Sequence, residues 1–313
     1  MNAELEGGRA AEAIASPHVP AAGGKALAPG LYLVATPIGN LEDITLRALR
    51  VLAMADRIAC EDTRQTAKLL AHFGIATPTV SYHLHNERGR AEQLLAQLQA
   101  GARIAVVSDA GMPGIADPGA ELVALAVAAE IPVFPVPGAN AALSALIASG
   151  CGTESFCFHG FLPSKSGQRR TVLEDLRAAS VKAQGASSPT HLFYETPHRI
   201  VEALEDIVAV FGTEQPVVLA RELTKLHEEF LRGTAAAVLA LLRERESVRG
   251  EMVLLLNAAA VREERSAPLS LAAEVKALLA QGIAEKDALK QVAKTRGLGK
   301  SEAYREWQRA KDR

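Results

Sequence analysis

The loop over residues 108–119, SDAGMPGIADPG, combines a shaped backbone with a group that can do chemistry. It follows the apolar run 104–107 and precedes a helical pattern. Its three glycines let the backbone approach a ligand closely, its two prolines hold one loop shape, and Asp109 adds a carboxylate. An ordinary connecting loop is the alternative, but a loop this long inside a compact domain is usually functional. We therefore predict that it binds a ligand.

Two further turns follow apolar strands in the same way. Residues 31–40, LYLVATPIGN, form a strand and a tight turn in which Asn40 can cap a helix, and residues 135–142, PVPGANAA, open a helix at Asn140. In an open α/β sheet, ligands bind where the carboxyl ends of strands meet helix N-termini. The first turn lacks the G-x-G-x-x-G pattern of a dinucleotide-binding loop. The three loops together predict a cleft lined mainly by backbone and small side chains.

Charged clusters end two strands in the second half of the chain, at 194–199 (YETPHR) and 221–229 (RELTKLHEE). Buried strands seldom end in so many ionisable groups without a use, so we predict that both clusters line the cleft. The alternative is an ion-pair network among Glu195, Arg199, Arg221 and Glu222.

Two segments are basic. Residues 163–170, PSKSGQRR, read as a flexible loop that suits phosphate contacts through Lys165, Arg169 and Arg170, with a solvated surface as the alternative. Residues 286–313 hold nine Lys and Arg against four Asp and Glu, which fits either a polyanion partner or a solvated helix face.

No metal site is expected from the spacing of possible ligands. His83 and His85 alternate along one strand, but no third ligand follows at a suitable distance. The three cysteines also lack metal-ligand spacing, and they fit buried side chains in a reducing cytoplasm.

The chain of 313 residues, 49% of them hydrophobic, is long enough for two domains and a small third. It has no apolar run of about 18 residues, so no membrane span is expected. Residues 1–29 mix Gly, Ala, Pro and Glu without the apolar core of a secretory signal, which predicts a disordered extension.

Strand-like runs alternate with helical patterns over residues 30–138, as in βαβ units, and predict an N-terminal α/β domain with a mostly parallel sheet. One of its helices is expected near 41–54. Residues 139–258 predict a second α/β domain, whose short strand connections, including a strand at 227–231, indicate a mixed or antiparallel sheet. A polar linker at 258–268 leads to three helical patterns, which predict a helix-turn-helix-like module over 268–313.

The motifs of the chain, taken in order, closely resemble those of ribosomal RNA methyltransferases of the tetrapyrrole methylase superfamily. The resemblance covers about residues 30 to 310 and implies two α/β domains with S-adenosylmethionine bound in the cleft between them. It also implies a cytoplasmic homodimer that methylates the ribose 2′-oxygen of a decoding-centre cytidine, in free 16S ribosomal RNA or in the small ribosomal subunit. The motifs are VATPIGNLEDITLRAL, CEDTR, SYHLHNE, VSDAGMPGIADPG, PVPGANAA, GFLP, FYETPHR and ARELTKLHEE.

The resemblance also implies which residues touch the cofactor. The first turn departs from the G-x-G-P-G-D form of tetrapyrrole enzymes, which favours the RNA-modifying branch. The implied contacts are Pro37, Asp109, Ala110, Gly111, Ile115, Asn140, Ala141, Tyr194 or Glu195, and Leu223.

A ribose hydroxyl is a weak nucleophile, so a base within hydrogen-bond reach would assist such a transfer. The candidates are Glu61, Asp62, Glu195 and Glu222, and Arg64, Arg199 and Lys225 are candidates for phosphate contacts beside the basic segment that holds Lys165, Arg169 and Arg170. Two other functions stay open. One is a methyltransferase of the same fold that acts on a tetrapyrrole or another small molecule, and the other is a non-catalytic RNA-binding protein.

Overall fold

The computed structural model describes residues 26–83, 86–182, 188–257, 271–280, 282–296 and 298–311. The chain divides into two compact units, residues 1–259 and residues 260–313. Most of the expected extension, His85 and the expected linker lie outside the described residues. Among the described helices, none is long and apolar enough to cross a membrane.

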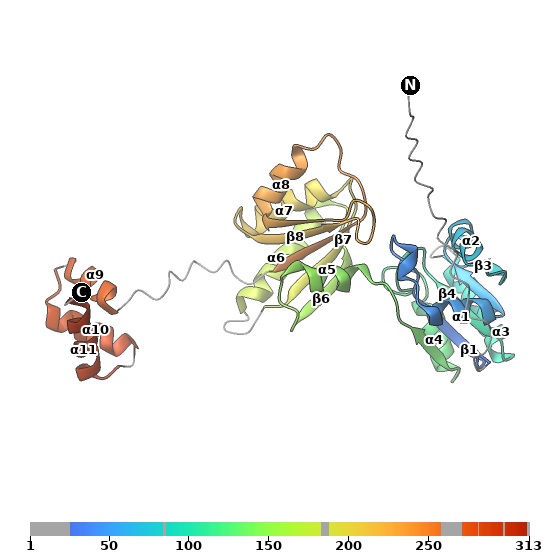
Figure 1. Cartoon of the computed structure of the whole chain (residues 1–313), viewed down its shortest axis with the longest axis horizontal. Coiled ribbons are helices and arrows are strands. Elements are labelled where there is room, and N and C mark those ends of the chain that lie inside the picture. Colours follow the sequence, from blue (N-terminus) through green and yellow to red (C-terminus); the bar gives the residue numbers. More distant parts are fainter. Residues whose placement is uncertain are drawn as a thin grey trace, which may run out of the picture. The chain divides into compact units, whose positions relative to one another are not determined.

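The first sheet of the larger unit is entirely parallel, in the strand order β3-β2-β4-β1-β5. Figure 1 labels its strands β1, β3 and β4. Helices α1 (Leu46–Met54) and α2 (Thr63–His72) bury leucines against one face, and α3 (Glu87–Gln99) and α4 (Ala120–Ala128) cover the other. This arrangement confirms the predicted mostly parallel sheet, and it brings all five carboxyl ends to one edge. The strands are β1 (Gly30–Val34), β2 (Arg57–Cys60), β3 (Thr79–Ser81), β4 (Arg103–Val107) and β5 (Val133–Val136).

The single helix expected near residues 41–54 is two elements. A 3-10 turn, η1 (Leu41–Asp43), is capped by Asn40, whose side chain accepts a hydrogen bond from the amide of Glu42. Helix α1 begins separately after Thr45, whose backbone is extended and whose hydroxyl accepts a hydrogen bond from the amide of Ala48. Two capping residues five positions apart therefore divide the segment.

The second sheet is mixed, in the order β6-β7-β10-β8-β9, with β6 parallel to β7 and the other pairs antiparallel. This confirms the mixed sheet expected here. Helix α5 (Ala141–Ser149) packs on one face, and α6 (Ser166–Lys182), α7 (Ile200–Phe211) and α8 (Ala235–Arg243) pack on the other. The strands are β6 (Phe156–Phe161), β7 (Thr190–Glu195), β8 (Pro216–Arg221), β9 (Glu229–Thr234) and β10 (Met252–Asn257).

The strand expected at 227–231 is displaced along the chain, because β9 runs from Glu229 to Thr234. The preceding turn contains two residues with left-handed backbones, Glu222 at φ 51° and Thr224 at φ 64°. Left-handed residues of this kind interrupt the extended backbone, so the pairing of β9 with β8 begins only at Glu229.

The described residues of the smaller unit form three helices, α9 (Leu271–Ala280), α10 (Glu285–Arg296) and α11 (Lys300–Lys311). Val275, Val292 and Trp307 are buried among them. The Trp307 indole donates a hydrogen bond to Glu285 at 2.9 Å, so a polar partner accompanies the largest buried ring.

Candidate active site

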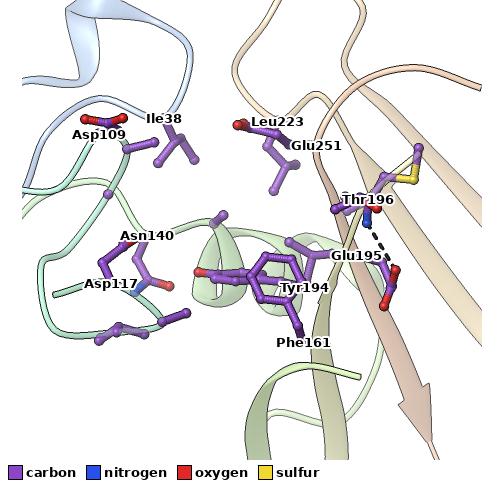
Figure 2. A pocket seen from close by; sticks show the side chains of 18 of the residues that line it. Ile38, Asp109, Asp117, Asn140, Phe161, Tyr194, Glu195, Thr196, Leu223 and Glu251 are labelled. Carbon is purple, nitrogen blue, oxygen red and sulfur yellow. Dashed lines mark hydrogen bonds between the residues drawn. The ribbon is translucent and has the colours of Figure 1, made fainter. Parts of the chain in front are cut away.

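A cavity of about 320 Å³ lies in the larger unit, at the carboxyl ends of the first sheet and against the second (Figure 2). The loop after β4, the start of α5 and the strands β7 and β10 supply most of its wall. Apolar side chains and several carboxylates share that wall. Its residues are Ile38, Asp109, Ala110, Gly111, Met112, Ile115, Ala116, Asp117, Asn140, Ala141, Phe161, Tyr194, Glu195, Thr196, Pro197, Ala220, Leu223, Glu251, Met252 and Val253.

Backbone hydrogen bonds hold the predicted loops together. Thr36 and Gly111 exchange two of them, at 2.9 Å and 3.1 Å, and the Thr36 hydroxyl donates to the carbonyl of Ser108 at 3.1 Å. Gly111 has φ +87°, a conformation that glycine adopts without strain. A Cβ atom at Gly138 would lie 2.8 Å from the Cβ of Ala35, so this close approach of two loops also requires glycine.

The structure gathers nearly all of the cofactor contacts implied by the resemblance around this one cavity. Figure 2 shows Tyr194 pointing into the cavity beside Phe161, while Asp109 and Asn140 lie on the facing loops. That these residues bind a cofactor stays a prediction. The residues on the wall are Asp109, Ala110, Gly111, Ile115, Asn140, Ala141, Tyr194, Glu195 and Leu223.

Pro37 lines a second cavity, of about 460 Å³, and not the first. The two cavities share Ile38, Asp109, Ala110 and Glu251, so they adjoin. The second carries cationic and amide groups: the exposed Gln65 and Lys68 from α2, and the half-buried Lys225 from the turn after β8, which pairs with Glu222 and Glu251.

Three of the four candidate bases have structural partners. The Glu195 carboxylate is fully buried, pairs with Arg199 at 3.0 Å, and lies on the opposite side of its strand from Tyr194 (Figure 2). Asp62 caps α2 and pairs with Arg64 at 2.9 Å. Glu222 pairs with Lys225 at 2.9 Å, and the cationic partner lowers its pKa against the opposing effect of burial.

The fourth candidate, Glu61, belongs to a cluster of mutually repelling acids. Burial is the main cause of its raised pKa, and the nearby negative charge of Asp109 raises the pKa further. Asp117, on the wall of the first cavity, was not among the candidates from the sequence. Burial, followed by repulsion from Glu61 and Asp109, raises its pKa to about 6. The sequence signal that could have identified Asp117 is its position in the same glycine- and proline-rich loop as Asp109.

The basic segment 163–170 is not a flexible loop, because α6 begins at Ser166. Arg169 is buried, pairs with Asp206 at 2.6 Å and donates to the carbonyls of Pro163 and Ser164, so its charge does not face solvent. Arg170 is half exposed but also pairs with Asp206. Burial of the guanidinium corrects the prediction that Arg169 contacts phosphate.

The remaining cations expected at phosphates differ in accessibility. Arg64 is exposed beside Asp62, and Lys165 is exposed just before α6. Arg199 is engaged by Glu195 and by the carbonyl of Leu162. The ion-pair network considered as the alternative for Glu195, Arg199, Arg221 and Glu222 forms only in part. Glu195 pairs with Arg199, but Arg221 pairs with Glu229, and Glu222 pairs with Lys225.

The model of the tetrapyrrole (corrin/porphyrin) methylase family matches residues 30–239. A solved uroporphyrin-III C-methyltransferase from Thermus thermophilus, in complex with S-adenosylhomocysteine, has the same fold, with a TM-score of 0.50 and 19% identity. That likeness covers 73% of this chain and 98% of the other. Fold and family model together define a methyltransferase of the tetrapyrrole methylase family.

Relatives of higher sequence identity show which branch of the family the chain belongs to. Ribosomal RNA small subunit methyltransferase I of Halalkalibacterium halodurans is 49% identical over 278 residues, which cover 88% of this chain and 93% of the relative. The protein of the same name from Synechocystis is 46% identical over 275 residues, covering 88% and 95%. The chain belongs to this ribosomal RNA small subunit methyltransferase I family, as its motifs predict.

Proposed function

We propose that this methyltransferase transfers a methyl group from S-adenosylmethionine to the 2′-oxygen of a cytidine ribose in the decoding centre of 16S ribosomal RNA. One observation carries the proposal: a largely apolar cavity adjoins a second cavity that carries lysines, and Asp109 lies on the wall of both. One cavity suits a nucleoside cofactor and the other suits a phosphate-bearing acceptor. The names of the relatives support ribosomal RNA as that acceptor.

The first cavity fits the chemical groups of S-adenosylmethionine. Ile38, Leu223 and Tyr194 offer apolar and aromatic surface for an adenine ring. Asp109 offers a carboxylate to the positively charged amino group of the cofactor. The bound cofactor supplies an electrophilic methyl group, which leaves its sulfur and joins the ribose oxygen.

Positioning and proton removal are the tasks left to the protein. Holding the acceptor hydroxyl in line with the methyl group removes much of the entropic barrier. We assign the proton of the 2′-hydroxyl to Asp117, because a carboxylate with a pKa of about 6 is ionised at pH 7 yet more basic than an ordinary aspartate. Lys68 and Lys225 lie at the second cavity, where they would contact phosphates flanking the target nucleotide.

The target nucleotide must be unstacked to bring its ribose to these cavities. Additional phosphate contacts are assigned to the smaller unit. Lys286, Lys290 and Lys294 are all exposed on α10 at intervals of four residues, so they form one basic stripe, here called the α10 lysine stripe.

A homodimer in the cytoplasm, where ribosomal RNA is found, completes the proposal. Leu143 and Ile147 lie one turn apart on α5 and are 45% and 77% exposed. Phe156, at the start of the edge strand β6, is 43% exposed. Apolar side chains of this size on a helix and a strand edge favour association with a second copy of the chain.

The deciding experiment incubates the full-length protein and tritiated S-adenosylmethionine with small ribosomal subunits, or free 16S RNA, lacking 2′-O-methylcytidine. Nucleoside analysis should find the label in 2′-O-methylcytidine. Label in another nucleoside would overturn the proposed position. If the cofactor binds in calorimetry but no RNA is labelled, while a control methyltransferase modifies the same subunits, a small-molecule acceptor replaces RNA. If the protein binds RNA but not the cofactor, it is a non-catalytic RNA binder.

A further inference from the structure

A thiol and two imidazoles meet at the edge of the second sheet, outside both cavities. Cys157 and His159 belong to the edge strand β6, and His191 belongs to β7. Cys157 and His191 are register partners, and the ring nitrogens Nε2 of His159 and Nδ1 of His191 are 2.9 Å apart. One potential ligand atom from each of the three residues lies within 4.8 Å of the other two.

The arrangement follows from strand geometry. Alternate residues of a strand share one face, so Cys157 and His159 project to the same side, where the parallel register also places His191. This is the face that packs against α6, α7 and α8, because Phe193, two residues after His191, belongs to their core. Tyr194 belongs to the cluster on the opposite face, together with α5. The three residues are thus separated by the sheet from the Tyr194 side of the first cavity.

The site is partly built and partly open. His191 is 5% exposed, and the His159 ring stacks on Phe193 with centroids 4.9 Å apart and planes at 16°. Cys157 and His159 are exposed, so an ion from solvent can reach them.

We propose that Cys157, His159 and His191 bind a divalent transition-metal ion of the zinc type, with a water molecule as the fourth ligand. Thiolate sulfur and imidazole nitrogen are both ligand types that zinc binds in proteins. Bonds of about 2.0–2.3 Å in a tetrahedral site with one sulfur ligand set donor atoms roughly 3.3–3.6 Å apart, so the two imidazoles separate slightly and the exposed Cys157 side chain rotates inward. The bound ion ties the edge strand β6 to β7.

The test uses the full-length protein after treatment with a chelator, titrated with Co²⁺ as a spectroscopic substitute for zinc. We expect one equivalent to produce a sulfur-to-cobalt charge-transfer band together with the visible bands of a tetrahedral site, and Zn²⁺ to remove both. The variant Cys157→Ser should lose the charge-transfer band, and His159→Asn should weaken binding at least tenfold. Cys151→Ser is the matched control, since Cys151 is a free cysteine outside the cluster, and it should leave the spectrum unchanged.

Three results would overturn the site: a cobalt titration without a thiolate band, a band that survives Cys157→Ser, or a band that disappears in Cys151→Ser. A second measurement is independent of the spectrum. Zn²⁺ should raise the thermal unfolding temperature of the parent protein and of Cys151→Ser but not that of Cys157→Ser. Equal shifts in all three proteins would assign the zinc effect to another place. Cys157 and His159 are exposed, so their variants are expected to fold. His191 is buried, and for that reason it is not replaced in this test.

Discussion

Arg169 and Asp206 form an ion pair in which both side chains are removed from solvent. The Nε of Arg169 lies 2.6 Å from a carboxylate oxygen of Asp206, and the two side chains are 1% and 3% exposed. The Ser166 hydroxyl donates to both oxygens of the same carboxylate at 3.0 Å. Because Ser166 and Arg169 lie on α6 and Asp206 lies on α7, the pair fixes one helix against the other.

Replacing Arg169 by alanine should lower the free energy of unfolding by about 3–5 kcal/mol, because the buried Asp206 carboxylate would lose its buried counter-charge. Arg170→Ala is the matched control. Arg170 binds the same Asp206, but its side chain is 51% exposed, so the loss should be about 1 kcal/mol or less. Urea unfolding followed by circular dichroism measures both. Equal losses would mean that burial does not decide the strength of this pair.

Asp117→Asn should reduce the rate of methyl transfer about 10²–10⁴-fold, because an amide cannot accept the hydroxyl proton. The parent rate should rise as the pH passes about 6, where the raised pKa of Asp117 leaves the carboxylate ionised, and then level off. The variant should lose this rise. Initial rates between pH 5 and 8, with the exposed Asp175→Asn as control, provide the measurement. A variant with the parent's pH profile would remove Asp117 from the role of base.

Tyr194→Ala should weaken S-adenosylmethionine binding about tenfold or more, since the ring supplies much of the aromatic wall of the first cavity. Tyr194→Phe keeps the ring and should bind nearly as well as the parent. Isothermal titration calorimetry distinguishes the two variants. If both lose affinity equally, the hydroxyl and not the aromatic surface carries the interaction.

Neutralising the α10 lysine stripe with Lys286→Gln, Lys290→Gln and Lys294→Gln should weaken RNA binding and reduce the slope of log K against log salt by about two to three. Cofactor affinity should not change, because none of these lysines lines either cavity of the candidate site. Lys276→Gln, at an exposed position on α9, is the control and should alter the slope by at most about one. An unchanged slope in the triple variant would exclude phosphate contacts by the stripe.

Ile147→Arg should convert the proposed homodimer into monomers, because it places a charge in an apolar contact between copies. Leu241→Arg changes a leucine on α8, which packs on the other face of the sheet, and should leave the dimer intact. Light scattering coupled to size-exclusion chromatography gives the mass of each. A monomeric parent protein, or a dimer that tolerates Ile147→Arg, would refute this interface.

The elements of the fold follow largely from short-range signals in the sequence. Alternating apolar strands and amphipathic helices predicted the parallel first sheet, and short connections predicted the mixed second sheet. The division of residues 41–54 was missed because two caps, Asn40 and Thr45, compete within a continuous helical pattern. The onset of β9 was missed because left-handed backbones at Glu222 and Thr224 are not a property of those residue types.

The sequence by itself determined the loops that form the candidate site, because glycine, proline and capping residues act on their immediate neighbours. Tertiary structure alone decided the raised pKa of Asp117, the burial of Arg169, and the meeting of Cys157 and His159 with His191. Each of these depends on desolvation or on a partner distant in the chain. Such effects arise only when strands and helices pack, so no local pattern of residues can encode them.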